Sequence, residues 1–253
     1  MEYELKNVIA ERKTKTVYTD NNHVIKLFIE NYSKADILNE ALNQARVEEA
    51  TDLKIPKLVE VTKIGNRWAL VSEFIEGTPL DVLMTQNPEK MDEYLDLFVK
   101  LQIEVLNCKV PLLRRIKDKF KMKITDALNI DEATKYELLQ RLEGMKNHTK
   151  LCHGDFNPSN IIVKDNGEIY IIDWSHATQG NASADVARTF LIFSIQGKSD
   201  VAEKYLDMFS KQSGIDKKNI QRWIPIVSAS QMTKGKEEEQ EFLKKWTNIV
   251  DFE

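Results

Sequence analysis

Residues 152–174 have the sequence CHGDFNPSNIIVKDNGEIYIIDW, and this stretch decides the fold. Two short apolar runs, 161–164 and 169–173, flank an Asp-Asn-Gly turn and predict a β-hairpin. Asp155 precedes the first run, Asn160 borders it, and Asp173 closes the second. Because antiparallel pairing brings the two strand ends together, we expect Asn160 and Asp173 side by side, with Asp155 beside them.

Three polar side chains in this arrangement can do chemistry. Two oxygen donors suit Mg²⁺ held together with substrate phosphates. A further carboxylate can then orient a hydroxyl and accept its proton. The alternative is a set of turn and cap residues. That alternative must explain three polar residues at fixed offsets, each beside an apolar run, so the sequence favours a catalytic site.

The same stretch resembles the catalytic segment of the aminoglycoside phosphotransferase and choline kinase-like family. The protein-kinase pattern H-R-D-x-x-x-x-N followed by D-F-G appears here as H-G-D-F-N-P-S-N followed by I-D-W. The resemblance covers residues 150–190 most strongly and 16–82 moderately. It implies an α+β, two-lobed protein-kinase-like fold, with a small antiparallel β lobe carrying one helix and a larger, mostly helical lobe.

The resemblance implies a role for each polar residue of this segment. Asp155 would be the catalytic base, and Asn160 and Asp173 would be the Mg²⁺ ligands. His153 looks like the histidine that holds the catalytic loop in place. Asp185 looks like the buried aspartate that braces this loop through backbone N–H groups, although a helix N-cap or first-turn acid explains it equally well.

The resemblance also implies an adenine pocket. Ile162 would form its apolar floor, and Ile172 would line it from the next strand. Residues 70–80, LVSEFIEGTPL, match the family's hinge between lobes. There the backbone of Glu73, Phe74 and Ile75 would hydrogen-bond the adenine edge, while a plain strand and turn is the alternative.

Lys26 lies inside an apolar strand predicted over 23–29, where a lysine is unfavourable without a partner. It resembles the kinase lysine that contacts the α- and β-phosphates. Glu40, on a helix predicted from Lys34 to about Glu49 with Ser33 as its N-cap, resembles that lysine's ion-pair partner. The alternatives are Glu48 or Glu49 as partner, and an edge-strand lysine that prevents aggregation.

The segment expected to cover the phosphates departs from the pattern. It falls near residues 11–16, ERKTKT, and contains no glycine; indeed, none of the 9 glycines precedes Gly65. This absence excludes a Walker P-loop or a Rossmann fingerprint near the N-terminus. Phosphate binding would then depend on the three basic side chains and two hydroxyls of this segment. An exposed charged hairpin is the alternative.

Composition narrows the class of protein. The chain has 253 residues, 42% of them hydrophobic, and a formal net charge of −4. The hydrophobic content predicts a globular protein with a hydrophobic core, and the negative charge argues against nucleic acid as a partner. Cys108 and Cys152 predict free thiols in a reducing cytosol. No apolar run approaches the roughly 18 residues of a membrane span, and the N-terminus does not resemble a signal peptide, so we expect a cytoplasmic protein without a membrane partner.

The pattern of elements changes near Gly77. Strands and one helix are predicted before it, including a second hairpin over residues 57–75. Helices predominate afterwards, over 91–106, 131–145 and from 184 onward. We therefore predict a nucleotide-binding lobe over residues 1–77 and a helical lobe over 78–253 that carries the catalytic loop and acceptor site.

Two charged runs stand apart from this scheme. Residues 109–123 contain seven basic residues and one acid, which fits a solvated helix face or, less simply, an anionic partner. Residues 234–245 mix glutamates and lysines, which fits an exposed helix with i to i+4 pairs. An acid-lined cleft for a cationic substrate is the alternative there.

These observations predict an ATP- and Mg²⁺-dependent phosphotransferase that moves the γ-phosphate to a hydroxyl of a small molecule, aminoglycoside-, choline- or sugar-like. Its partner would be this acceptor, and the protein would be a monomer or weak homodimer. Two other hypotheses stay open. A protein-kinase-like enzyme is one, and a catalytically weak nucleotide-binding regulatory module, favoured by the missing glycines, is the other.

Overall fold

The structure is a computed structural model that describes residues 3–20 and 22–247. The chain divides into two compact units. The first takes in the chain through Gln86 together with Pro158–His176, and the second takes in Asn87–Asn157 and the chain from Ala177 onward. The first unit reaches past the predicted boundary after Gly77 and includes the hairpin of residues 161–171. The division of function between residues 1–77 and 78–253 stays a prediction.

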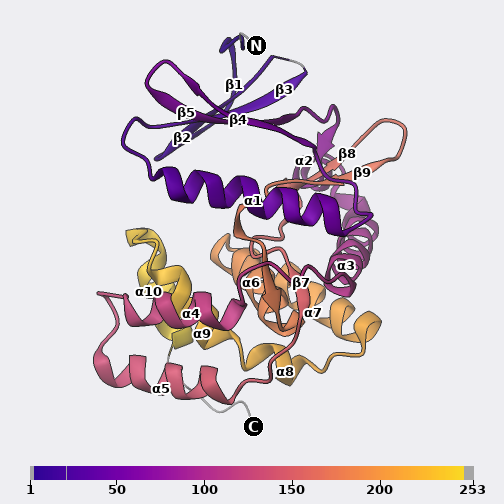
Figure 1. The fold of residues 1–253 in the computed structure, drawn as a ribbon. Helices are drawn as coiled ribbons and strands as arrows, with labels where there is room; N and C mark the ends of the chain where they lie inside the picture. Colours follow the sequence, from indigo (N-terminus) through magenta and orange to yellow (C-terminus); the bar gives the residue numbers. More distant parts are fainter. Residues whose placement is uncertain (1–2, 21, 248–253) are drawn as a thin grey trace. The chain divides into compact units, whose positions relative to one another are not determined.

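The first unit contains a five-stranded antiparallel sheet in the order β1-β2-β3-β5-β4. Its strands are β1 (Asn7–Arg12), β2 (Lys15–Thr19), β3 (His23–Phe28), β4 (Leu58–Ile64) and β5 (Arg67–Glu73). Helix α1 (Lys34–Ala50) begins after Ser33, whose side chain accepts a hydrogen bond from the Asp36 N–H, as the sequence predicts. It lies along one face of the sheet (Figure 1). Phe28 and Leu70 pack there against Ile37 of the helix.

A second, smaller sheet in the first unit contains the hairpin predicted within residues 152–174. It has the order β6-β8-β9, formed by β6 (Thr78–Pro79), β8 (Ile161–Val163) and β9 (Ile169–Ile171). Helix α2 (Leu80–Gln86) follows β6 directly, and single 3₁₀ turns, Pro158–Asn160 and Trp174–His176, flank the hairpin. The predicted hairpin is therefore present, and it pairs with the chain that leaves the larger sheet.

Gly77 is a position where this pairing depends on a missing side chain. A Cβ at this position would lie 2.6 Å from the Val163 carbonyl oxygen, and backbone atoms cannot rotate away as a side chain can. We expect Gly77→Ala to lower the free energy of unfolding by about 1–3 kcal/mol, because it forces β6 away from β8. Gly144→Ala, at the end of a helix with no atom near the new methyl group, is the matched control. It should be neutral or stabilising by up to about 1 kcal/mol in the same urea titration.

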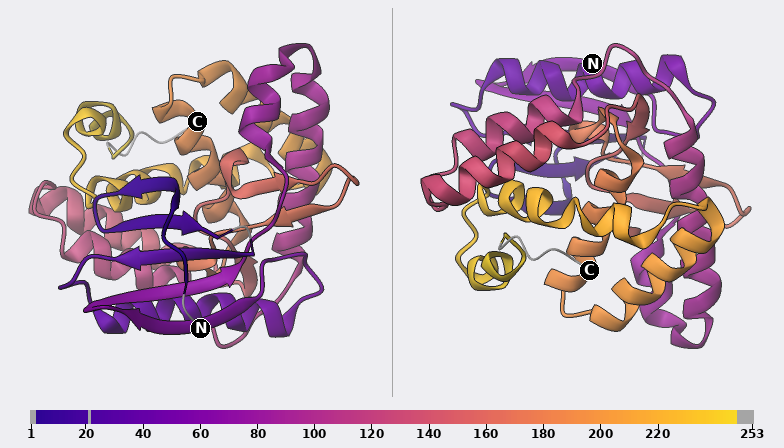
Figure 2. Two further views of the ribbon diagram at one scale, coloured as in Figure 1. Left: turned by 90° about the horizontal axis from the view of Figure 1, so that it is seen from above. Right: turned by 90° about the horizontal axis from the view of Figure 1, so that it is seen from below.

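The second unit is mostly helical. Its helices are α3 (Met91–Asn107), α4 (Ile116–Thr125), α5 (Glu132–Gly144), α6 (Ala182–Ile195), α7 (Ser199–Ser213), α8 (Lys217–Gln221), α9 (Ile224–Met232) and α10 (Glu237–Thr247). Figure 2 shows α4 and α5 side by side, and α9 packs against α4, α6 and α10. A short strand pair, β7 (Lys150–Cys152) with β10 (Thr178–Gly180), frames the catalytic loop. Rings of Phe98, Phe156 and Tyr205 pack in the core behind it.

Helices expected over 91–106 and 131–145 are present as α3 and α5. Helix α6 begins slightly before the predicted position, because Asn181 caps it by accepting a hydrogen bond from the Ser183 N–H. Among residues 3–20 and 22–247, no helix is long and apolar enough to span a bilayer. Cys108 and Cys152 are both free thiols.

Candidate active site

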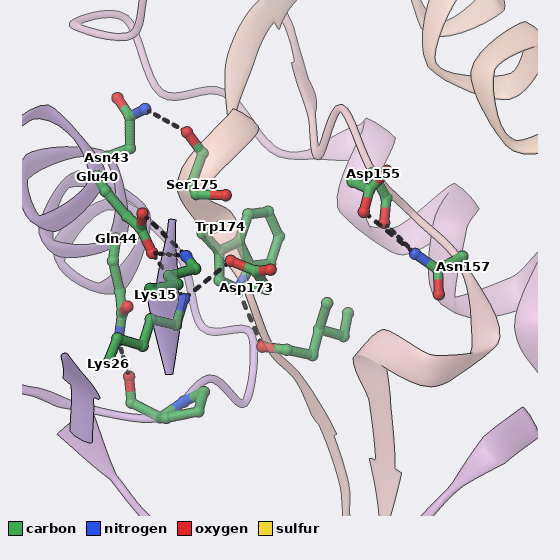
Figure 3. Close-up of polar contacts among 12 residues, drawn as sticks. Lys15, Lys26, Glu40, Asn43, Gln44, Asp155, Asn157, Asp173, Trp174 and Ser175 are labelled. Atoms are coloured by element: carbon green, nitrogen blue, oxygen red, sulfur yellow. Dashed lines mark hydrogen bonds and ion pairs between the residues drawn. The ribbon is translucent and has the colours of Figure 1, made fainter. Parts of the chain in front are cut away.

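Lys26 joins two carboxylates from different elements of the first unit. Its ammonium nitrogen lies 2.7 Å from Glu40 Oε1 on α1 and 2.9 Å from Asp173 Oδ1 at the end of the β8–β9 hairpin (Figure 3). Glu40 and Lys26 are largely buried, with 12% and 13% of their side-chain surface exposed. The spacing in sequence is 14 residues to Glu40 and 147 to Asp173. Folding therefore converts three scattered charges into one cluster.

The two carboxylates determine the charge of Lys26. Burial works to lower its pKa, but the negative charges of Asp173 and Glu40 raise that pKa well above the usual lysine value. Lys26 is therefore a permanent cation beside Asp173. Such a cation is suited to hold phosphate oxygens.

The alternatives for Lys26 and its partner do not fit the structure. The edge-strand alternative fails because β3 lies between β2 and β5 in the middle of the sheet. Glu48 accepts a hydrogen bond from the Leu58 N–H, at 3.0 Å, so it holds the start of β4 instead. Glu49 is exposed at the end of α1.

Lys15 is a second lysine on the same carboxylate. Its ammonium lies 3.1 Å from Glu40 Oε1 and 5.3 Å from the centre of the Phe28 ring. Burial and the neighbouring charge of Lys26 lower the pKa of Lys15. Glu40 is thus shared by two ammonium groups (Figure 3).

The segment over residues 11–16 joins β1 and β2, the two strands before Lys26, as the sequence predicts, and its covering of the phosphates stays a prediction. Glu11 and Arg12 belong to β1, and Lys15 and Thr16 belong to β2, so only residues 13–14 form the turn. Neither alternative for this segment describes it fully. Lys15 points inward to Glu40, whereas Lys13 is exposed at the turn.

The hairpin register brings Asn160 close to Asp173 along the backbone. The Asn160 carbonyl accepts a 2.9 Å hydrogen bond from the Ile172 N–H, and Asp173 is the next residue. Asp173 has φ +61°, the sole positive value at a non-glycine residue among those the structure describes. A carboxylate held in this uncommon conformation suggests a functional constraint.

Asn160 and Asp173 offer an amide oxygen and a carboxylate, which are hard donors of the kind that Mg²⁺ prefers. Within residues 3–20 and 22–247, no group of three or more His, Cys, Asp or Glu side chains could hold a metal by itself. The pair therefore fits a cation that takes its remaining ligands from water and substrate phosphates. It does not fit a metal enclosed by protein ligands.

The predicted hinge follows the end of β5. The Glu73 N–H donates to the Lys57 carbonyl and the Phe74 N–H donates to the Asn22 carbonyl, both at 2.9 Å. For the Ile75 N–H, no hydrogen bond occurs within the described part of the chain. Of the three predicted hinge residues, Ile75 is thus the one whose N–H stays available as a donor, and the contact with an adenine edge stays a prediction.

The two isoleucines predicted at the adenine site occupy neighbouring positions of the small sheet. Ile162 lies on β8, opposite Tyr170, and keeps 8% of its surface exposed. Ile172 directly follows β9 and is half-buried. Both positions suit an apolar surface that a planar ring can cover.

The part of the predicted catalytic loop through Asn157 lies in the second unit. Asp155 Oδ1 accepts a 3.1 Å hydrogen bond from Arg188 Nη2 on α6, and Asn157 Nδ2 lies 3.4 Å from Asp155 Oδ2. His153 is fully buried, and its Nδ1 accepts a 3.3 Å hydrogen bond from the Asp155 N–H. The carboxylate is held from one side by a guanidinium, and the loop beneath it is held by a histidine.

Asp185 contacts this loop directly. Its Oδ1 accepts a 2.7 Å hydrogen bond from the Gly154 N–H, and its Oδ2 lies 3.3 Å from Gln102 Nε2. Burial raises the pKa of Asp185. Asn181 supplies the N-cap of α6, so Asp185 does not cap the helix, but Asp185 does lie in its first turn, and the first-turn alternative therefore stands beside the bracing role. Its contacts are those that bracing the catalytic loop requires.

A sequence profile of the phosphotransferase enzyme family matches residues 15–218. The chain belongs to this family. The match runs from Lys15 through the hinge, the catalytic loop and α6. Membership in the family confirms the predicted family and the predicted class of enzyme, a small-molecule phosphotransferase. Among curated proteins, none matches the sequence significantly.

Solved structures confirm the two-lobed protein-kinase-like α+β fold. A thermostable mutant of aminoglycoside phosphotransferase APH(4)-Ia, in ternary complex with ADP and hygromycin B, matches with TM-score 0.69 and 15% identity over 94% of this chain and 89% of that one. LicA in complex with AMP matches with TM-score 0.61 and 16% identity over 93% of this chain and 83% of that one. Aminoglycoside-3'-phosphotransferase of type VIII matches with TM-score 0.64 and 13% identity over 90% of this chain and 93% of that one. The nucleotides in these complexes, ADP and AMP, are ligands of those two proteins.

Two residues of the site were not predicted in their observed roles. The sequence places Lys15 in a phosphate loop, and only the β2–β3 register, which aligns Val17 with Lys26, puts it on the inner face with Lys26. Arg188 lies 33 residues after Asp155 with no local motif to mark it. A basic residue three positions after the predicted brace Asp185, on the same helix face, was the available signal.

Proposed function

We propose that this chain transfers the γ-phosphate of ATP to a hydroxyl group of a small molecule, with the residues predicted from the sequence as its machinery. The observation that carries the assignment is the Lys26 ammonium between Glu40 and Asp173. A lysine held between a helix carboxylate and the carboxylate that ends the catalytic hairpin is the arrangement used for phosphate positioning in kinases.

In this mechanism Lys26 holds the phosphates, and the backbone of Glu73, Phe74 and Ile75 receives the adenine edge above Ile162 and Ile172. Asp155 orients the acceptor hydroxyl. The oxygen of this hydroxyl forms a bond to the γ-phosphorus. The bond between that phosphorus and the oxygen that bridges to the β-phosphate breaks, and ADP leaves. The hydroxyl proton passes to Asp155.

Asn160 and Asp173 would hold Mg²⁺. When bound there, the ion supplies neutralisation of the negative charge on the phosphates. His153 and Asp185 position the loop that carries Asp155 through the contacts described above. Most of the acceleration would come from positioning and charge neutralisation.

The test is acceptor-dependent formation of ADP from ATP by the purified chain. A panel of small alcohols, sugars, hydroxy acids and amino sugars should contain an acceptor that raises ADP formation well above hydrolysis and appears as a phosphorylated product by mass spectrometry. Phosphorylation of protein substrates but of no small alcohol would favour the protein-kinase-like alternative. Nucleotide binding without turnover, in wild type and Asp155→Ala alike, would favour the regulatory module.

Lys15 gives a prediction specific to this chain. If its ammonium takes over the task of the missing loop glycines, Lys15→Met should raise the KM for ATP about 3- to 10-fold and change kcat little, because charge-assisted contacts to phosphate are lost. Lys13→Met, at the exposed turn of the same hairpin, is the matched control and should leave both constants unchanged. Equal effects of the two substitutions would show that only the net charge of the hairpin matters.

The finer predictions about partners and location accompany this proposal. We propose a cytoplasmic enzyme that is a monomer or weak homodimer and binds no nucleic acid and no membrane. The net charge of −4 supports the exclusion of nucleic acid. Sedimentation velocity of the purified chain tests the oligomeric state.

A further inference from the structure

Four basic side chains of the second unit come from neighbouring segments, and Arg188 among them contacts the predicted catalytic loop at Asp155. We call them the basic cluster: Lys119, Lys123, Arg188 and Lys234. Lys119 and Lys123 are four residues apart on α4 and therefore share one helix face. Arg188 comes from α6, and Lys234 follows the end of α9. Because α9 packs against both α4 and α6, these three segments are neighbours (Figure 2).

The cluster is set apart from the other basic residues of α4. Lys119 and Lys123 are half-buried, whereas Lys121 between them is exposed. Lys117 points toward α5, where it donates to the carbonyls of Glu143 and Met145 at 3.0 Å. The solvated-face interpretation of residues 109–123 therefore holds for Lys121 and fails for Lys119 and Lys123.

The members of the cluster repel one another. Burial, and then the charges of Lys123 and Arg188, lower the pKa of Lys119 to about 7. Lys234 is exposed at the surface, and the loss of part of its hydration together with the charge of Arg188 lowers its pKa to about 8. Burial and Arg188 also lower the pKa of Lys123. Asp185 raises the pKa of Lys119 and Asp155 that of Lys234, but neither carboxylate outweighs the repulsion. The cluster thus has an excess of positive charge that an anion would relieve.

Arg188 connects the cluster to the reacting centre. Nη2 lies 3.1 Å from Asp155 Oδ1, and Nη1 lies 2.7 Å from Gln231 Oε1 on α9. The side chain is 13% exposed, and these two contacts hold the guanidinium in one orientation. A guanidinium has five N–H donors, so donors remain for an oxyanion beside the proposed catalytic base.

Glu239, the buried glutamate after α9, does not balance this charge. It pairs with Lys236 at 2.7 Å and with Gln231. Its charge is therefore neutralised locally by Lys236. An acid-lined cleft over the 234–245 run stays an alternative, but Glu239 does not add net negative charge to it.

Resting on the proposed function, we propose that the acceptor is an anion: a small molecule that carries a phosphate or carboxylate group in addition to the hydroxyl that is phosphorylated. The basic cluster binds that group, and Asp155 faces the hydroxyl. Lysine and arginine bind oxyanions through charge-assisted hydrogen bonds. An amino sugar with several ammonium groups would instead meet repulsion from Arg188 and from the lysines of the cluster that are protonated.

The binding step is tested with sulfate, which keeps two negative charges across the pH range, by calorimetric titration at constant ionic strength. Lys123→Gln should weaken sulfate binding about 10- to 100-fold, as expected for the loss of a charged hydrogen-bond donor. Lys121→Gln on the same helix is the matched control and should change it less than about 2-fold. Lys26→Met, on the nucleotide side, should also leave it unchanged. Equal sulfate affinity in Lys123→Gln and Lys121→Gln would overturn the proposal.

Proton uptake gives a second measurement that a purely structural role would not affect. Lys119 is mostly neutral at pH 8, so a bound anion that raises its pKa must draw protons from the buffer. The groups that act on Lys119 are Lys123, Arg188, Lys234, Asp185 and Cys152. Sulfate binding at pH 8 in buffers of different ionisation enthalpy should show this uptake, and Lys119→Met should reduce it, whereas Lys121→Met should not. Absence of uptake by the wild type would count against the cluster.

Acceptor pairs test the substrate class: ribose against ribose 5-phosphate, glycerol against glycerate, and hygromycin B as the cation. The anionic member should have the higher kcat/KM, and Lys123→Gln should raise its KM at least about 10-fold. Preference for the neutral or cationic compound overturns the proposal and leaves the phosphotransferase function intact. Sulfate binding that depends on Lys123, without transfer to any compound, upholds the anion site and overturns the proposed function.

Discussion

Asp155→Asn should reduce phosphoryl transfer about 10²- to 10⁴-fold, the usual contribution of a positioned general base. The amide keeps the size of the side chain, and its oxygen can still accept the hydrogen bond that Arg188 donates to Asp155. What is lost is the negative charge that orients the acceptor hydroxyl and takes its proton. The loss should appear in kcat, with the KM for ATP nearly unchanged, because the nucleotide contacts come from residues of the first unit.

Asp165→Asn is the matched control for this experiment. Asp165 lies in the exposed turn of the β8–β9 hairpin, where asparagine is equally acceptable. It should leave kcat within about 2-fold of wild type, as expected of an exposed substitution. Steady-state kinetics and a urea titration of both variants separate a catalytic effect from unfolding. If Asp155→Asn kept activity within about threefold of wild type, Asp155 would not be the base.

The polar ends of the hairpin could be predicted because their signals are local. Asn160, the turn and Asp173 lie within 14 residues, and a short antiparallel hairpin has few possible registers. Lys26 could be predicted because a lysine within an apolar strand needs a partner, and Glu40 lies on the next helix. Each inference used chain neighbours or adjacent elements.

Lys15, Arg188 and the basic cluster could not be predicted in the same way. Whether Lys15 faces Glu40 or solvent depends on the strand register, and a one-residue slip would turn it to the other face. Lys119 and Lys123 differ from Lys121 only in the side of α4 on which they lie: theirs is half-buried, and that of Lys121 is exposed. Arg188 reaches Asp155 from a helix 33 residues away. Contacts between distant elements leave little trace in a single sequence.

The nature of the acceptor depends on these less predictable residues. Lys26, Glu40, Asn160 and Asp173 are the residues that local patterns indicate, and we assign them to the nucleotide and its metal. We place the acceptor site among helices of the second unit, where the resemblance is weakest. There we propose an anionic acceptor in place of the aminoglycoside- or choline-like ones that the resemblance implies, because Arg188 lies beside Asp155 and the lysines of the basic cluster come from neighbouring segments.

Asp173→Asn should lower kcat/KM for ATP by at least about 100-fold, because it removes the carboxylate of the proposed metal pair. Asparagine is chosen because it tolerates the φ of +61° at this position and can still accept a hydrogen bond from Lys26. Nucleotide affinity measured without Mg²⁺ should change little, whereas the gain in affinity on adding Mg²⁺ should be lost. Fluorescence titration with a labelled ADP, with and without Mg²⁺, measures both.

Two further variants separate metal binding from backbone strain. Asp173→Ala lacks the carboxylate and also places alanine in the left-handed region, so it should be about 1 kcal/mol less stable than Asp173→Asn in urea. Glu168→Gln also removes a carboxylate from the same hairpin, one that forms an ion pair with Lys54, and this variant should keep full activity. If Asp173→Asn retained the Mg²⁺-dependent gain in nucleotide affinity, the metal would have to be held without Asp173. The pairing of Lys26 with Asp173 would then serve to position the lysine alone.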